Sequence, residues 1–210
     1  MSVEQTPLRT PKDSALRGAV RFVALANFAY FGVEFTIALL IGSVALLADS
    51  IDFLEDTLLN LLILLGLSWS PVWRGRLGMV LAGVLLIPGL ATIRTAWEKF
   101  QNPVPPDPVL LAVAGVGALV VNLTCALVLA RHRQHHGSLA KAAFLSARND
   151  ALANVAIVGA GLLTAVILSG WPDLIVGLGI LTINADAARQ VWIAARREIR
   201  VENQKSVAET

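Results

Sequence analysis

The sequence predicts an all-α membrane protein, a bundle of six transmembrane helices with the N- and C-termini in the cytoplasm. Of the 210 residues, 56% are hydrophobic and only 15% are charged, which is too apolar for a soluble domain of this size. The charged residues gather at the two ends of the chain and between apolar runs of about 20 residues, the length that a helix needs to cross a bilayer. The basic residues lie mostly on one side of these runs.

The apolar runs divide the chain into three regions. We expect a polar segment at residues 1–18, a transmembrane domain at 19–195 and a short polar tail at 196–210. Only Gly42-Ser43 separates the first two runs, so they form an antiparallel hairpin. A proline-rich stretch at 101–108 ends the third run and starts the fourth. The expected spans are Arg21–Ile41, Val44–Leu67, Leu77–Trp97, Val109–Ala130, Leu139–Leu168 and Trp171–Ala194.

The positions of the basic residues indicate the orientation. If the N-terminus is cytoplasmic, 14 of the 17 Lys and Arg residues lie on the cytoplasmic side. Only Arg94 and Lys99 then face the other side, and Arg148 lies within the fifth span. This asymmetry follows the positive-inside rule, so we expect both termini in the cytoplasm and a multi-pass protein of the inner cell membrane.

The second span carries four acids, Asp49, Asp52, Glu55 and Asp56, in its first half. A carboxylate at the middle of a membrane costs about 2.5–3.5 kcal/mol on insertion scales, so acids there mark a pathway or binding site. Asp52 and Asp56 are four residues apart on one helical face, and Asp49 lies close to that face. Neighbouring carboxylates repel, so they share protons, find positive charge or bind a cation. The alternative is hydrogen bonding between helices by protonated acids.

The first and fifth spans add polar residues that can face these acids. Glu34 of the first span is expected to face the protein interior, because its charge is costly toward lipid. In the fifth span, Ser146, Asp150 and Asn154 recur every four residues and form one polar stripe, with Asn149 beside it. A stripe that faces the acids of the second span would make a cation site at the middle of the bilayer.

All three histidines lie in the loop between the fourth and fifth spans. His132, His135 and His136 are spaced closely enough to capture a transition metal from the cytoplasm, since imidazole suits zinc, copper, nickel and iron. An ordinary basic loop explains them equally well. A closed zinc site needs four ligands, so this loop is not a structural site.

Taken together, these motifs resemble the cation diffusion facilitators, also called cation efflux proteins. The most specific segment is Ala48–Asp56, and the resemblance covers most of residues 20–195. Its further parts are Asn27 and Glu34, Gly42-Ser43, Asn122, Asp150 and Trp171–Gly177.

The resemblance implies six spans, a homodimer, and exchange of a divalent metal for protons. The family takes two site residues from span 2 and two from span 5, which implies Asp52, Asp56 and Asp150 here. The fourth position, commonly His or Asp, falls on Ser146. Serine is a weak ligand, so water, Asn149 or the amide of Asn154 can take its place.

Family members often carry a cytoplasmic C-terminal domain. This sequence ends about 15 residues after the sixth span. We therefore expect no such domain here, and dimerisation through the membrane helices.

The predicted function is efflux of a divalent metal cation by alternating access, coupled to protons because the ligands must be deprotonated to bind metal. Asp49, Glu34 and Asn154 support the site. Oxygen ligands favour zinc, cobalt, iron, manganese or cadmium over copper(I). We expect metal ions, protons and lipid as partners, with no permanently bound cofactor and no nucleic acid.

Three other classes compete with this prediction. One of them, a proton-coupled exporter of organic cations, fits poorly because the spans contain few aromatic residues. Ser146 fits a degenerate, non-transporting membrane subunit of the same fold. Paired aspartates also occur in intramembrane enzymes that use them for acid–base chemistry, but the sequence contains no nucleophile elbow and no phosphate loop. We therefore do not expect an enzyme.

Overall fold

The computed structural model describes residues 11–66, 71–131 and 137–185. For residues 11–14, 16 and 137–148, and for several between 62 and 82 and near 85, the description covers the backbone alone. The described residues form six helices and no strand, as the sequence predicts. The helices are α1 (Pro11–Ile41), α2 (Val44–Gly66), α3 (Pro71–Gln101), α4 (Pro108–Ala130), α5 (Gly137–Ile167) and a final helix, Trp171–Ala185.

Three segments within the described residues are long and apolar enough to cross a membrane. They are Arg17–Ile41 in α1, Pro108–Ala130 in α4 and Asn149–Ile167 in α5. α2 carries four acids, α3 begins with two arginines in its first two turns, and the final helix is described over Trp171–Ala185 alone. These three segments support a membrane protein.

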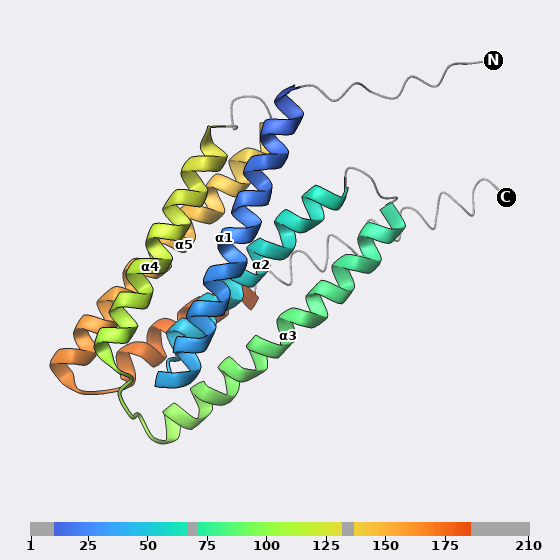
Figure 1. Ribbon diagram of the computed structural model, residues 1–210. Coiled ribbons are helices and arrows are strands. Elements are labelled where there is room, and N and C mark those ends of the chain that lie inside the picture. Colours follow the sequence, from blue (N-terminus) through green and yellow to red (C-terminus); the bar gives the residue numbers. More distant parts are fainter. Residues whose placement is uncertain (1–10, 67–70, 132–136, 186–210) are drawn as a thin grey trace, which may run out of the picture.

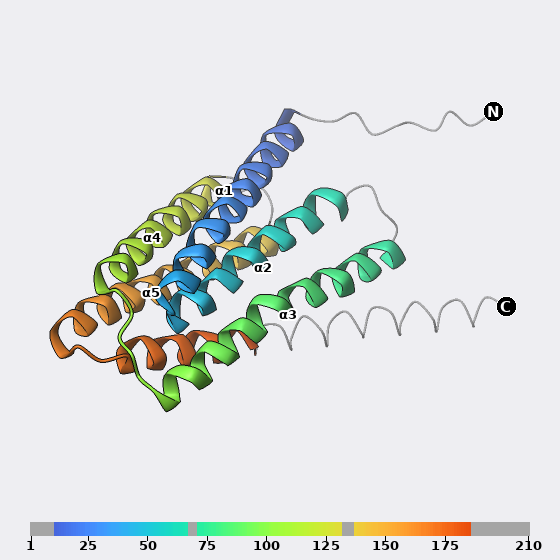
Figure 2. The ribbon, with the colours of Figure 1, turned by 60° about the horizontal axis from the view of Figure 1, so that its bottom comes forward.

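The helices pair as two hairpins that lie side by side. α1 packs on α2, α4 packs on α5, and α1 also packs on α4, while α2 reaches α5 (Figure 1). Among the labelled helices of the described part, α3 contacts α2 alone, and it lies on the side of α2 away from α4 and α5 (Figure 2). The core at the centre of this arrangement contains the fully buried side chains of Leu46, Leu47, Leu111 and Ile157.

Glycines allow α5 to approach α4 closely and the final helix to approach α2 closely. A Cβ added at Gly161 of α5 would lie 3.0 Å from the backbone nitrogen of Ala112 in α4. A Cβ added at Gly177 of the final helix would lie 2.6 Å from the carbonyl carbon of Val44 in α2. Small residues are the usual means by which membrane helices bring their backbones together.

The tight turn between α1 and α2 marks one end of the molecule, here called the hairpin end. Gly42 adopts a φ of 63°, which favours glycine, and the next residue, Ser43, is fully buried. α3, α5 and the connections to α4 and the final helix also meet at this end (Figure 1). The backbone N–H of Gly170 donates to the carbonyl of Pro103 at 3.0 Å and joins two of these connections.

Asp173 holds the hairpin end together. One carboxylate oxygen accepts from the Ser43 hydroxyl at 2.5 Å and from the Ala45 N–H at 3.2 Å, and the other accepts from the Val44 N–H at 2.9 Å. The second oxygen also receives the Lys99 ammonium at 2.6 Å. Both side chains are buried. Asp173 therefore caps α2 and ties α3 and the final helix to it.

Lys99 lies at the hairpin end, and its charge turns inward. Its side chain is only 6% exposed and its ammonium is paired inside the protein, while the side of the membrane that the sequence predicts for Lys99 stays a prediction. The aliphatic stem of lysine allows the ammonium to reach back into the bundle where a carboxylate is available. Arg94 of the same helix is exposed and pairs with Glu98.

Candidate metal centre

The acids of α2 lie on a helix formed mainly by leucine. Leu46, Leu47 and Leu54 are buried and fix the helix against its neighbours, so the polar positions between them are held in place. Asp49 is fully buried, whereas Asp52 and Asp56 are half-buried. The carboxylates of α2 therefore range from fully buried in the core to partly accessible.

α5 adds Asp150 to this group. Its carboxylate is half-buried, and the charges of Asp49, Glu55 and Asp56 all act on it. Asp52 in turn experiences the charges of Asp49, Asp56 and Asp150. Asp150 of α5 and the acids of α2 therefore lie near enough to interact electrostatically, and their sharing of one metal ion stays a prediction.

No cation within the described residues neutralises these acids. The ion pairs formed by these residues are Arg94–Glu98, which is exposed, and Lys99–Asp173 at the hairpin end. Within the same residues, no three His, Cys, Asp or Glu side chains are close enough together to coordinate one metal ion. The acids of α2 and α5 therefore have no ion-pair partner among the described residues, and a metal ion that binds three of them must draw them closer together.

The supporting residues differ in their surroundings. Glu34 of α1 is fully buried, and so is Asn154 of α5, one helical turn beyond Asp150. Neither carboxylate oxygen of Glu34 and neither amide atom of Asn154 has a hydrogen-bond partner among the described residues. Asn149 is exposed, unlike its neighbour Asp150.

Two predicted groups lie outside what the structure describes. Ser146 belongs to α5, but its side chain is outside the described set. His132, His135 and His136 are outside the described residues altogether. Their roles remain predictions from the sequence.

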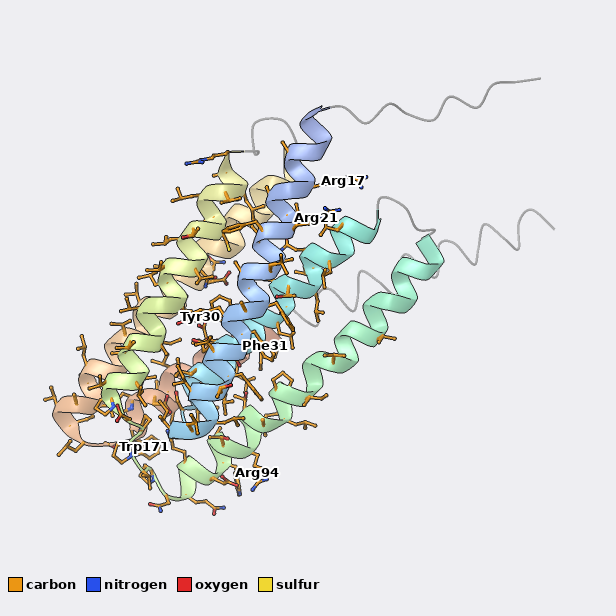
Figure 3. The ribbon with its side chains drawn as sticks, in the orientation of Figure 1. Arg17, Arg21, Tyr30, Phe31, Arg94 and Trp171 are labelled. Carbon is orange, nitrogen blue, oxygen red and sulfur yellow. The ribbon has the colours of Figure 1, made fainter. Side chains whose placement is uncertain are left out.

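Tyr30 connects α1 to α4 beside the acids. Its hydroxyl donates to the carbonyl of Ala114 at 2.6 Å, and Gly117 of α4 leaves the space that the ring fills. The ring also lies 5.0 Å from that of Phe53 in α2. Figure 3 shows Tyr30 near the middle of α1, with Arg17 and Arg21 toward its beginning and Arg94 and Trp171 at the hairpin end.

Sequence reasoning missed two polar contacts that position α2. Lys99 and Asp173 pair across 74 residues, and Asn184 of the final helix donates to the carbonyl of Ala48 at 3.2 Å. In the sequence, each of these contacts is indicated only by a polar residue that lies within or beside an apolar run, which does not identify its partner. Neither residue belongs to the acidic cluster, but both contacts fix the helix that carries it.

Comparison with known proteins places these features in a family. Residues 20–74 and 76–199 match the cation efflux transmembrane domain. The chain is 30% identical over 209 residues to the zinc transporter ZitB of Escherichia coli (strain K12), and equally similar to ZitB of Shigella flexneri. The aligned region covers 91% of this chain and 64% of each relative, so the chain spans less than two thirds of the curated relatives it matches.

Proposed function

Because the chain belongs to the cation efflux family, we propose that it carries a divalent metal cation across a membrane and that zinc is among its substrates. The two relatives named above are zinc transporters, which supports this choice of metal. Membership of this family indicates a transporter and not an enzyme.

The observation that carries the proposal is the cluster of uncompensated carboxylates from α2 and α5. We assign Asp52, Asp56 and Asp150 as the metal ligands, with Ser146 at the fourth position. Carboxylates at membrane depth are retained where they bind or conduct ions. Asn149 is exposed, so we place it outside the ligand set in this conformation.

Proton exchange follows from the same residues. A carboxylate must lose its proton before it binds metal, so loading releases protons and protonation favours release of the metal. We propose antiport by alternating access on this basis. Asp49, Glu34 and Asn154 support the site through their charge or amide groups.

We propose an inner-membrane, six-span arrangement with both termini cytoplasmic, and a homodimer. The basic residues at the beginning of α1 and the exposed Trp171 at the hairpin end are consistent with opposite membrane interfaces. The proposed domain spans residues 19–195, between polar segments 1–18 and 196–210.

The experiment that tests the function is metal flux into proteoliposomes under an imposed pH gradient. Zinc and cobalt flux is expected with the wild-type chain and is expected to fall to background in Asp56→Ala and Asp150→Ala. Glu98→Gln is the matched control, because it removes an exposed acid on α3 away from the cluster. Equal flux in all four proteins would overturn the site, and absence of wild-type flux would favour a non-transporting subunit.

A further inference from the structure

The final helix holds α2 at two places through polar side chains of its own. At the hairpin end, Asp173 accepts from the N–H groups of Val44 and Ala45. Further along the final helix, the buried side-chain amide of Asn184 donates to the backbone carbonyl of Ala48 in α2 at 3.2 Å. The two helices lie side by side over this stretch (Figure 2). The first contact caps α2, whereas the second lies within the helix and needs a separate explanation.

The carbonyl that Asn184 contacts belongs to the turn of α2 that leads to the proposed metal ligands. In an α-helix each carbonyl accepts from the N–H group four residues later, so the carbonyl of Ala48 already has Asp52 as its partner. α2 therefore has no unsatisfied group at Ala48 that requires a side chain from another helix. Ala48 and Asp52 also lie one above the other on the same helical face. Asn184 thus contacts α2 one helical turn before Asp52.

Among the described side chains, no hydrogen bond joins α2 to α5. Three polar side chains of α2 form hydrogen bonds with α2 itself or with α1, those of Ser50, Thr57 and Asn60. α5 packs closely on α4, where Gly161 meets the backbone of Ala112. The position of the α2 acids relative to Asp150 therefore depends on the helices that hold α2 from its other sides.

The position of α2 matters because its acids do not yet converge with that of α5. Within the described part of the chain, no three such side chains lie close enough to hold one ion, so metal binding has to bring the two helices closer. A metal ligand must lie within about 0.2 Å of its usual distance from the ion. An attachment at Asp173 alone leaves α2 able to pivot about its first turn, and the attachment at Asn184 removes that freedom.

We propose that Asn184 is a positioning residue of the metal site, which fixes the depth and rotation at which α2 presents Asp52 and Asp56 to α5. This inference rests on the proposed function. It gives the final helix, which contributes no ligand to the proposed site, a part in setting the metal affinity and the coordination geometry. If Asn184 only satisfied its own amide in apolar surroundings, its loss would change stability and leave the bound metal as it is.

The test measures the affinity and the visible absorption spectrum of Co²⁺ bound to the full-length protein in detergent. The cobalt bands report the number and geometry of the ligands, which a change in stability alone does not alter. Asn184→Leu removes the amide but keeps a side chain of similar size, and Asn184→Gln keeps the amide on a longer stem. Thr182→Val is the matched control, because the exposed Thr182 hydroxyl donates to the carbonyl of Leu178 in its own helix at 2.7 Å.

We expect Asn184→Leu to bind cobalt about tenfold more weakly than the wild type, as is typical when a group that orients metal ligands is lost. Its cobalt bands are expected to change as well. Asn184→Gln should lie between Asn184→Leu and the wild type, and Thr182→Val should equal the wild type in both measurements. Asn184→Ala takes the place of Asn184→Leu if the leucine variant does not fold.

A folded Asn184→Leu or Asn184→Ala protein with wild-type affinity and wild-type bands would overturn the inference, whatever its melting temperature. An Asn184→Gln protein that binds cobalt no better than Asn184→Leu would also overturn it, because the amide would then not be the group that matters. A wild-type protein that neither binds nor transports cobalt would instead overturn the proposed function, and that outcome is read from the wild type alone.

Discussion

At the scale of single residues, the acids of α2 differ sharply in their surroundings although they share one helix. Asp49 is fully buried, whereas Asp52 and Asp56 are half-buried. The half-buried acids are the ones that an ion can reach without opening the core, and they are the acids that we propose as metal ligands.

Ser146, which we propose as the fourth ligand, is the position at which we expect a substitution to change the metal preference most directly. Its hydroxyl is a weaker ligand than imidazole, and imidazole suits zinc better than manganese. We expect Ser146→His to raise the affinity for zinc relative to manganese about tenfold, equivalent to about 1.4 kcal/mol. Competition between the two metals, measured by calorimetry on the purified protein, checks this. An unchanged ratio would show that position 146 does not contact the ion.

Gly177 has no side chain, and this allows the final helix to pack closely on α2. We expect Gly177→Ala to destabilise the protein by about 1–3 kcal/mol, because the added methyl group overlaps the backbone of Val44. Gly179→Ala is a matched control on the same helix, since nothing lies within 4 Å of its added Cβ. Thermal unfolding in detergent separates the two variants. Equal melting temperatures would contradict the close packing of the final helix on α2.

At the scale of helices, the hairpin end is held by one buried ion pair and three hydrogen bonds to α2. We expect Asp173→Asn to cost about 3–5 kcal/mol, because it leaves the Lys99 ammonium buried without a carboxylate. Lys99→Met should cost less, since Asp173 still accepts from Ser43, Val44 and Ala45. Unfolding by denaturant measures the order. A larger loss in Lys99→Met than in Asp173→Asn would contradict the capping role.

The helices themselves were largely predictable from the sequence. α2 begins at Val44, as predicted, because Gly42-Ser43 cannot continue a helix, and α4 begins with Pro108, whose preceding Asp107 accepts from the N–H groups of Val109 and Leu110. α3 is longer at both ends than the predicted Leu77–Trp97. Hydropathy detects only the apolar part of a helix that would lie in the bilayer. The helix can extend beyond that part as long as its backbone N–H and C=O groups remain hydrogen-bonded.

The candidate site was predictable in part, for a related reason. Acids within an apolar span stand out in any sequence, and spacing places Asp52 and Asp56 on one face. The partners of Glu34 and Lys99 depend on how helices pack, which a pattern within one helix does not contain. The contact of Lys99 with Asp173 became evident only in the folded chain.

At the scale of the whole molecule, the six helices all have one end at the α1–α2 turn, so the orientation of one fixes the others. In a Cys125→Ser background, we expect Asn102→Cys to react with a membrane-impermeant thiol reagent in intact cells. Ala208→Cys should react only after the cells are permeabilised, because the proposed topology, drawn from the basic residues, places the C-terminus in the cytoplasm. The reverse pattern would contradict the proposed topology.

The central claim is that acids from α2 and α5 bind the same metal ion, and a double-mutant cycle on zinc affinity tests it most directly. Calorimetry would compare the wild type with Asp56→Asn, Asp150→Asn and the double variant. If both residues hold one ion, each single variant loses at least about tenfold in affinity, and the double variant loses much less than the product of the two losses. Losses that multiply independently, or single variants that bind zinc like the wild type, would contradict a shared site.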